Sequence, residues 1–395
     1  MSQQLINHSP DLKRLRDEGY HVEVRGGYLV IRHIPYVNSA LEVKHGTMVS
    51  KLTLASNNLT TRPETHVMYF IGEHPHNADG TIISGIVHSS QNQTLAEGIS
   101  TNHSFSNKPP NGYENYYEQV KRYAEIISNQ AKALDENVTA TPFNIVIDED
   151  IESVFQYMDT NSSRANINML NAKFKNQKIA IIGLGGTGAY ILDMVAKTQV
   201  KEIHLFDGDV FLLHNAFRSP GAASNEILET KPKKVNYYHS LYSKMHKYII
   251  EHDCYITDEN LSELKEMSYV FICVDRNDAR KAIIDYLLSV GVPFIDVGLG
   301  VNVIEGEDEC LIGTVRTTVG TAAKNDHLAN RVPTGVNDNN EYGTNIQVAD
   351  LNNLNAVMAV IKWKKLSGFY QDLENEHHFT YSINVAQLLN EDLTT

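Results

Sequence analysis

The sequence contains few cysteines, and their spacing excludes two kinds of site. Three occur in 395 residues, Cys254, Cys273 and Cys310, and none belongs to a Cys-x-x-Cys pair. Three isolated cysteines do not make a disulfide framework, so we expect a reducing compartment, the cytoplasm. A structural zinc site built from two Cys-x-x-Cys pairs cannot form in this chain.

Long hydrophobic runs and an excess of basic residues are also absent. No apolar stretch reaches the roughly 20 residues that span a membrane, and the N-terminal segment MSQQLINHSPDLKR lacks the apolar centre of a signal peptide. The formal net charge of −14 disfavours general binding to nucleic acids or to anionic membranes. A hydrophobic content of 42% is ordinary for a soluble globular protein, and the length allows two domains with sizeable cores.

The pattern of the chain changes near residue 150, which indicates two domains. In residues 1–148, strand-like runs alternate with turn signals, and the Gly26-Gly27 pair between two such runs predicts a hairpin. A helix is predicted where apolar side chains recur at helical spacing, at Tyr116, Val120, Tyr123 and Ile127. We therefore predict an α+β domain here, followed by an α/β domain in residues 150–395. In that second domain strands and helices alternate as in a mainly parallel, Rossmann-like sheet.

Two later segments carry weaker signals. The stretch from Gly320 to Gly343 is polar and rich in turn-forming residues, and a loop of that length inside a domain is usually functional or mobile. A helix is predicted beyond it. Its core and dimer-contact face would be formed by regularly spaced apolar residues, Ile346, Leu351, Leu354, Met358 and Ile361.

A nucleotide-binding motif lies in the segment IAIIGLGGTGAYILDMVAKTQVKEIHLFDGD, residues 179–209. An apolar strand-like run leads into a glycine cluster, Gly183, Gly185, Gly186 and Gly188, and then into a helical pattern. Glycines at that place let phosphate groups approach the backbone N–H groups at the start of the helix. The next strand ends in Asp207 and Asp209, where an acidic side chain usually accepts hydrogen bonds from ribose hydroxyls. The motif alone does not identify the nucleotide, and a glycine-rich packing turn is the simpler alternative.

The residues after Asp209 indicate which family of nucleotide-binding proteins the motif belongs to. The chain continues with DGDVFLLHNAFRS, then ETKPKKV, then VFICVDRNDARKAI. This ordered series resembles the ThiF/MoeB/HesA family, which includes the ubiquitin-activating enzymes. The elements of the resemblance are GxGGxG, an Asp-x-Asp strand end, Asn-x-x-Arg, a lysine after a turn, and a strand-end Asp with Arg280 five residues on. The resemblance covers about residues 160–370 and disfavours an NAD dehydrogenase.

The resemblance implies an ATP site that adenylates a carboxylate, in which two anions meet and a metal is needed. Arg218 and Lys233 would then contact the phosphates, with Lys231 and Lys234 as alternatives to Lys233. Asp275 would hold Mg²⁺, although an acid before a helix is often only an N-cap. Asp209, together with Asp207, would contact the ribose, and Asn215 would orient the nucleotide.

The resemblance also implies a homodimer. In this family an arginine just ahead of the first nucleotide-binding strand reaches into the ATP site of the neighbouring subunit, and Arg164 in TNSSRANINMLN is the matching candidate. Its simpler interpretation is an arginine on a helix surface.

The chain departs from the family where members that form an acyl thioester carry a cysteine, because the loop from Gly320 to Gly343 has none. The activated acyl group would then pass to a hydroxyl or directly to a partner. Threonines near that loop are weak hydroxyl candidates, namely Thr317, Thr318, Thr321 and Thr334.

The N-terminal domain resembles an uncharacterised domain fused to ThiF-type proteins in bacterial operons for ubiquitin-like conjugation. The similarity lies in GISTNHSFSNKPPNGYENYYEQVKRY, and one fold compatible with its layout is a degenerate conjugating-enzyme-like fold.

The sequence therefore predicts an ATP- and Mg²⁺-dependent enzyme that adenylates the C-terminal carboxylate of a ubiquitin-like protein and hands it to a conjugating-enzyme-like partner. Two alternatives stay open. One is adenylation of a sulfur-carrier protein or a peptide, and the other is a nucleotide-binding scaffold without catalysis.

Overall fold

The computed structural model describes residues 2–56, 59–145, 153–165, 167–305, 309–335 and 346–394. The chain divides into two compact units. One comprises Met1–Ile151 with Tyr157–Arg164, and the other comprises Glu152–Gln156 with Ala165–Thr395. In the described part of the chain, no helix combines the length and the apolar character needed to cross a membrane.

The N-terminal unit is built on an antiparallel sheet with the strand order β1-β2-β3-β6-β10-β7. These strands are β1 (His21–Arg25), β2 (Tyr28–Val37), β3 (Val43–Lys51), β6 (Val67–Ile71), β7 (Val87–Ser89) and β10 (His103–Ser106). The remaining strands form two small ribbons, β4 (Leu54–Ser56) with β5 (Leu59–Thr60), and β8 (Gln93–Ala96) with β9 (Ile99–Thr101). The predicted hairpin is confirmed, since Arg25 pairs with Tyr28 and the two glycines between them have φ angles of 55° and 80°.

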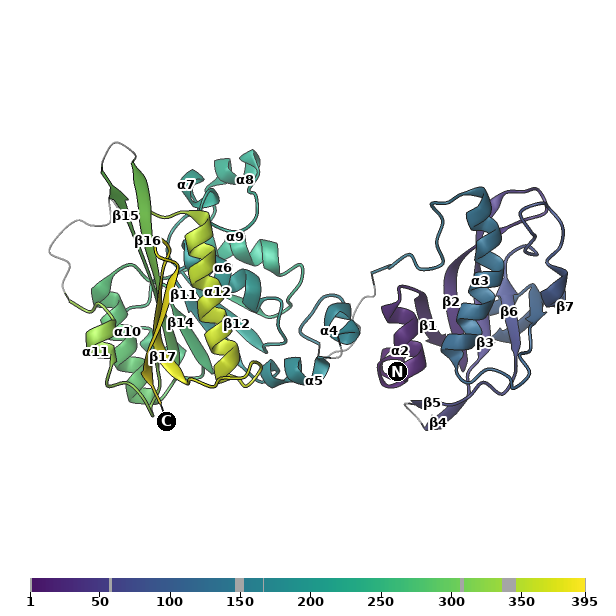
Figure 1. The fold of residues 1–395 in the computed structure, drawn as a ribbon, viewed down its shortest axis with the longest axis horizontal. Helices are drawn as coiled ribbons and strands as arrows, with labels where there is room; N and C mark the ends of the chain where they lie inside the picture. The colour runs from purple at the N-terminus through teal and green to yellow at the C-terminus, as the bar shows by residue number, and fades with distance from the viewer. Residues whose placement is uncertain are drawn as a thin grey trace. The chain divides into compact units, whose positions relative to one another are not determined.

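Helices cover the sheet of the N-terminal unit and complete its core. They are α1 (Ser2–His8), α2 (Pro10–Asp17), α3 (Tyr116–Leu134) and the short α4 (Thr160–Arg164), with the 3₁₀ turn η1 at Ser84–Ile86. Helix α3 runs along β2 (Figure 1) and is capped by Asn115, whose side chain accepts a hydrogen bond from the Glu118 amide N–H at 2.9 Å. The four residues predicted to form the apolar face of this helix are all buried.

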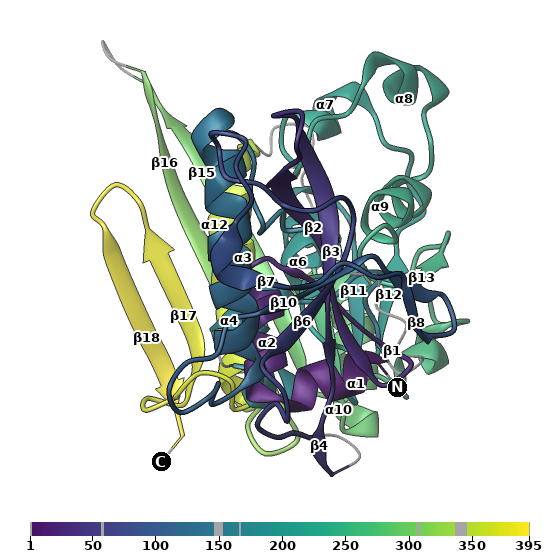
Figure 2. The same ribbon diagram turned by 90° about the vertical axis from the view of Figure 1, so that its right-hand side faces the viewer.

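The C-terminal unit contains a mixed sheet with the order β13-β12-β11-β14-β15-β16-β17-β18. Its strands are β11 (Lys178–Ile182), β12 (Glu202–Phe206), β13 (Ile249–His252), β14 (Tyr269–Ile272), β15 (Phe294–Ile304), β16 (Cys310–Gly320), β17 (Glu376–Ser382) and β18 (Gln387–Leu393). Pairing is parallel from β13 to β15 and antiparallel from β15 to β18. The unit is therefore Rossmann-like on one side, with an antiparallel extension that Figure 2 shows as the hairpins β15–β16 and β17–β18.

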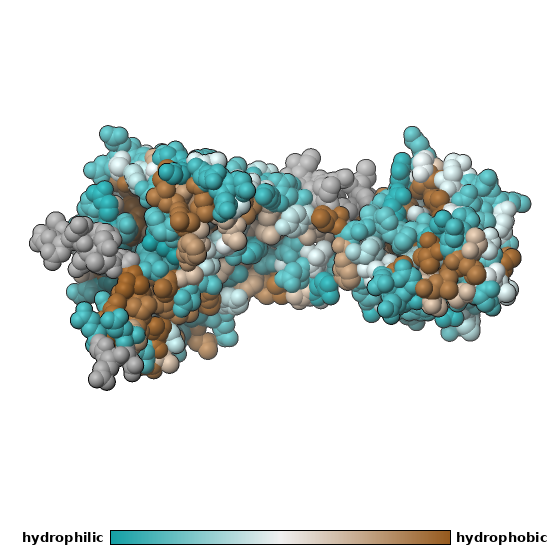
Figure 3. Space-filling model, turned by 90° about the horizontal axis from the view of Figure 1, so that it is seen from above, coloured by the Kyte–Doolittle hydropathy of each residue, from teal (hydrophilic) through white to brown (hydrophobic). Residues whose placement is uncertain are grey.

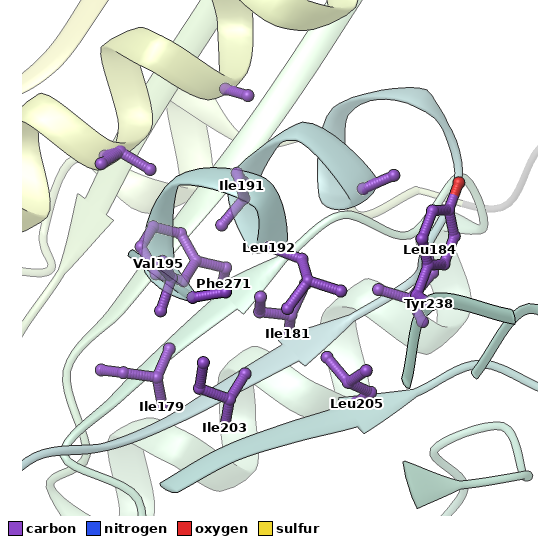
Figure 4. Packing of buried hydrophobic residues seen from close by; sticks show 14 of the residues in the cluster. Ile179, Ile181, Leu184, Ile191, Leu192, Val195, Ile203, Leu205, Tyr238 and Phe271 are labelled. Carbon is purple, nitrogen blue, oxygen red and sulfur yellow. The ribbon is translucent and has the colours of Figure 1, made fainter. Parts of the chain in front are cut away.

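Helices lie on both faces of this sheet, with α6 and α12 on one side and α10 and α11 on the other (Figure 1). The helical elements are α5 (Asn168–Asn171), η2 (Ala172–Phe174), α6 (Gly186–Val195), α7 (Leu213–Ala216), α8 (Asn225–Thr230), α9 (Lys234–Tyr242), η3 (Leu261–Leu264), α10 (Asn277–Val290), α11 (Leu328–Arg331) and α12 (Ala349–Leu366). Figure 4 shows Ile191, Leu192 and Val195 of α6 above the isoleucines and leucine of β11 and β12. Burial of this apolar face fixes the start of α6 at the carboxyl end of the sheet.

Two expectations from the sequence need correction. The buried face of α12 includes the predicted Leu351 but also Asn352, Asn355 and Trp363, whereas Ile361 is exposed, so the predicted core face is only partly correct. The segment from Gly320 to Gly343 contains helix α11, and its residues 336–343 lie outside the described residues.

The surface seen in Figure 3 is mainly hydrophilic, with separate hydrophobic patches on each unit. Scattered apolar side chains on a surface are normal for a folded protein.

Candidate active site

The glycine turn between β11 and α6 can exist only with glycine at two positions. Gly183 has a φ of 89°, and a Cβ atom there would lie 2.6 Å from the Cys273 carbonyl oxygen. At Gly188 a Cβ atom would lie 1.9 Å from the Gly183 carbonyl oxygen. The turn therefore brings bare backbone N–H groups to the start of α6, where they line a cavity and can receive phosphate oxygens.

Asp207 lies just beyond the end of β12 and braces the glycine turn. The Leu184 amide N–H donates to its Oδ2 at 2.7 Å, and the Asp209 amide N–H donates to its Oδ1 at 2.8 Å. Burial raises the pKa of this carboxyl, although the ammonium of Lys234 and the two amide donors oppose the shift. Asp207 therefore holds the loop in place while it lines the cavity wall.

Asp209 is the more accessible of the two acids. Its Oδ2 lies 2.7 Å from the Lys234 Nζ, and the Tyr255 hydroxyl donates to its Oδ1. Partial burial would raise the pKa of this carboxyl, but the hydrogen bonds from Lys234 and Tyr255 outweigh it and hold the pKa below its usual value. A carboxylate at this place can accept hydrogen bonds from ribose hydroxyls.

The lysine in the cavity is Lys234. It is the first residue of α9, its side chain is 8% exposed, and its Nζ also lies 3.4 Å from the Asp207 Oδ2. Lys233 points elsewhere, because its Nζ donates to the Gly208 carbonyl at 2.7 Å and pairs with Asp253 at 3.1 Å. The structure places the alternative lysine, and not Lys233, among the lining residues.

Arg218 lines the cavity from the loop after α7. Its Nε is buried and has no hydrogen-bond partner among the described residues. A buried donor without a partner is costly, and an anionic group in the cavity would satisfy it. Asn215, three residues earlier, is buried and is not one of the residues that line the cavity. Its Oδ1 accepts a hydrogen bond from the Leu212 amide N–H at 2.8 Å.

Asp275 follows β14 and is exposed at the cavity wall. The N-cap position of α10 is Arg276, so Asp275 lies one residue before it. Arg280, buried in the same helix, donates to the Val274 carbonyl and pairs with Asp296 at 3.0 Å, which braces the strand end that carries Asp275. The guanidinium therefore supports the strand end that carries Asp275, and Arg280 also lines the cavity.

The donor set at Asp275 fits magnesium that arrives with a nucleotide. Among the described residues there is no group of three or more His, Cys, Asp or Glu side chains that could hold a metal ion. Mg²⁺ is commonly held by one or two carboxylates plus substrate phosphates, so it does not require such a group.

Several cavity residues had not been predicted. From α12, Asn352 accepts from the Thr187 hydroxyl at 3.1 Å, and Asn355 lies against the same hydroxyl at 3.4 Å. Arg316 of β16 and Tyr255 also line the cavity. Two asparagines at helical spacing in ADLNNLNAV were the available signal, because buried amides need polar partners.

The cavity has a volume of about 1620 Å³ and collects all four glycines, both acids, Arg218 and Asp275. Pockets for small ligands measure roughly 300–1,000 Å³, so this one has room for more than a nucleotide.

Arg164 lies in the other unit, exposed at the end of α4, with its guanidinium 5.7 Å from the centre of the Phe143 ring.

Two of the three cysteines are poorly placed to act as nucleophiles. Cys273 lines the cavity, and burial strongly raises the pKa of its thiol, as burial also does to a lesser degree at Cys254. Cys310 is exposed at the first residue of β16. A thiolate is the reactive form, so the two partly buried cysteines are poor nucleophiles.

Two models of protein families match the chain. A model of the ThiF family matches residues 132–331, and a model of a domain of unknown function, DUF6791, matches residues 10–160. Ubiquitin-like modifier-activating enzyme 5 of Mus musculus is 24% identical over 151 residues, which are 35% of this chain and 38% of that protein. The same enzyme of Dictyostelium discoideum is 26% identical over 149 residues, 35% of this chain and 39% of that protein. The match therefore spans well under half of these relatives.

Two solved structures are also similar. The crystal structure of E. coli MccB with ATP has a TM-score of 0.45 and 18% identity, and covers 71% of this chain and 82% of that one. The crystal structure of PaaA has a TM-score of 0.46 and 16% identity, with coverages of 57% and 75%.

Proposed function

The chain belongs to the ThiF family, and we propose that it uses ATP to adenylate the C-terminal carboxylate of a ubiquitin-like protein. The observation that carries the proposal is the cavity, in which the glycine turn, Asp209, Arg218, Lys234 and Asp275 lie together. The relatives named as activating enzymes of ubiquitin-like modifiers favour this class of substrate.

In the proposed reaction a carboxylate oxygen attacks the α-phosphorus of ATP. A new P–O bond forms to the carboxylate, the bond from the α-phosphorus to the bridging oxygen of the β-phosphate breaks, and pyrophosphate leaves with those electrons. Negative charge increases on the phosphates during this step, so preorganised cations lower its barrier. A bound Mg²⁺ would neutralise phosphate charge at Asp275.

Each residue of the cavity would contact a different part of the nucleotide. The backbone at Gly185 and Gly186 would receive phosphate oxygens at the start of α6. Asp209 would accept from the ribose, which requires it to exchange its bond with Lys234 or Tyr255 for the ribose hydroxyls. Lys234, once released, would join Arg218 at the phosphates.

The next step of the proposed reaction is transfer of the acyl group, and the reactivity of the cysteines bears on its acceptor. Because the partly buried cysteines are poor nucleophiles, we propose direct transfer from the adenylate to a conjugating-enzyme-like partner or to a hydroxyl. The N-terminal unit cannot carry an acyl thioester, because residues 1–253 contain no cysteine, and it would serve as a recognition domain.

The test is ATP–pyrophosphate exchange with candidate ubiquitin-like proteins, using the full chain. We expect Asp275→Ala to lower exchange by roughly 100-fold or more, and Asp285→Ala to leave it unchanged. Asp285 is a matched control, since it pairs with Lys281 on the exposed side of α10. Exchange by Asp275→Ala within a few-fold of wild type, with unchanged melting, would reject the assigned role.

The same assay separates the alternatives. Exchange with a short free peptide as fast as with any intact ubiquitin-like protein would favour a peptide substrate. Tight ATP binding without exchange for any carboxylate offered would favour a scaffold.

A further inference from the structure

Gly186, the third glycine of the nucleotide-binding motif, lies against a side chain from another helix. Backbone geometry explains the glycines at positions 183 and 188, but Gly186 does not have a positive φ. A Cβ atom there would lie 2.1 Å from the Nδ2 and 2.3 Å from the Cγ of Asn352, which α12 brings to the start of α6 (Figure 1). The glycine at position 186 therefore leaves space for the Asn352 amide.

Asn352 joins two segments of the cavity wall. The residue is 1% exposed, and its Oδ1 accepts a hydrogen bond from the Thr187 hydroxyl at 3.1 Å. Its Nδ2 donates to the backbone carbonyl of Arg218 at 3.4 Å. Thr187 lies in the first turn of α6, and Arg218 lies in the loop after α7. One buried amide therefore connects the start of the phosphate-binding helix to the loop that carries the cation.

The backbone of Arg218 is held by two contacts, while its side chain has a donor to spare. The Arg218 N–H donates to the Asn215 carbonyl at 3.1 Å, and the Arg218 carbonyl accepts from Asn352. The buried Nε has no hydrogen-bond partner among the described residues. Ordering a long side chain costs conformational entropy, so a backbone that is already fixed places the guanidinium at a lower cost.

We propose that Asn352 is a positioning residue, which holds Arg218 where the nucleotide's phosphates bind, and that residue 186 is glycine in order to admit it. This role rests on the proposed function, which places the phosphates at Arg218. Asn352 would then act on the phosphate groups through the guanidinium, and the part of the nucleotide without phosphates would be indifferent to it.

Binding of ATP and of adenosine to the full chain tests this role, because adenosine has no phosphate groups. In isothermal titration with Mg²⁺, Asn352→Ala should weaken ATP binding about tenfold, the effect of one lost hydrogen bond, and adenosine binding less than about twofold. Asn353→Ala is the matched control, since Asn353 is the next residue of α12 and is exposed. It should bind both ligands as wild type does.

Double variants show whether Asn352 acts through Arg218. In an Arg218→Met background, Asn352→Ala should change ATP affinity by less than about twofold, because residues that act as one unit are not additive. Gly186→Ala should weaken ATP binding more in wild type than in Asn352→Ala, which lacks the atoms that a Cβ at position 186 would meet. Melting temperatures show whether each variant folds, and Asn352→Ser gives the same comparisons should the alanine variant unfold.

Unchanged ATP binding by Asn352→Ala would overturn the proposal. An equal loss for ATP and adenosine would also overturn it, since it would indicate a general disturbance of the cavity, as would a loss that persists in full without the Arg218 guanidinium. Pyrophosphate exchange is measured separately. A protein that exchanges while Asn352→Ala shows no difference between the two ligands refutes this inference alone. One that shows the difference but does not exchange refutes only the proposed reaction.

Discussion

Lys233 and Lys234 are adjacent in the sequence but sit in different environments, so they should behave very differently when mutated. We predict that Lys234→Met lowers ATP–pyrophosphate exchange by about 100- to 1,000-fold, the cost of losing a preorganised cation at a developing charge. Lys233→Met should change exchange by less than about threefold, because its Nζ pairs with Asp253 at the surface and not with the cavity.

The expected stability effects follow from the ion pairs. Removing one partner of a buried pair costs about 3–5 kcal/mol when the other is left without compensation. Asp207 keeps two amide donors, and Asp209 is half exposed and keeps Tyr255, so we expect only about 1–2 kcal/mol for Lys234→Met. Lys233→Met should cost between 0 and about 1 kcal/mol, since both side chains of its pair are more than a third exposed.

Urea unfolding measures the stability of both variants, and exchange rates at saturating ATP measure their activity. ATP affinity, from isothermal titration, shows whether Lys234 acts on bound phosphates or only holds Asp209. Equal activity loss in the two variants, or a larger loss for Lys233→Met, would refute the assignment of the lysines from their contacts.

Three further predictions concern other parts of the chain. If Arg164 acts in the neighbouring subunit, Arg164→Ala and Asp275→Ala should each be inactive alone. After the two proteins are mixed and exchange subunits, they should recover up to about a quarter of wild-type exchange, because half the dimers are mixed and each of these has one intact site. No recovery despite proven mixing would refute the role of Arg164 in the neighbouring subunit. A covalent adduct with the protein substrate should resist thiol reductants, and a reductant-sensitive adduct lost in Cys310→Ser would instead establish a thioester. Burial lowers the pKa of His246 to about 4, below its unfolded value, so stability present above about pH 6.5 should fall by about 3 kcal/mol as the pH drops to 4. Thermal melts across this range should show a flatter pH dependence for His246→Gln.

The hairpin and helix α3 of the N-terminal unit and the nucleotide-binding strands could be predicted, because the conformational preferences of nearby residues determine them. The Gly26-Gly27 turn needs positive φ angles at both positions, which glycine adopts readily, and α3 shows its buried face through regular spacing. The order of glycines, acids and Arg218 along the chain placed them at the carboxyl ends of adjacent parallel strands, where they meet.

Two cases show what the spacing of residues in the sequence does not resolve. The lysine that enters the cavity depends on where α9 begins, and consecutive residues at a helix start point in different directions, so TKPKK left three candidates. In α12 the apolar periodicity indicated Leu354, Met358 and Ile361, but the face that packs carries Asn352 and Asn355. The Thr187 hydroxyl of α6 is hydrogen-bonded to both amides, a contact between residues 165 positions apart for Asn352.

Strand β15 has two parts. Residues Phe294 to Asp296 pair with both β14 and β16, and the remaining residues pair only with β16. Gly300 and Thr314 lie opposite each other beyond the last residue of β15 that pairs with β14, so substitutions there leave the pairing of the parallel strands unchanged. We therefore expect that the β15–β16 hairpin beyond Asp296 can be exchanged for another sequence while the glycine turn and Asp209 keep their places.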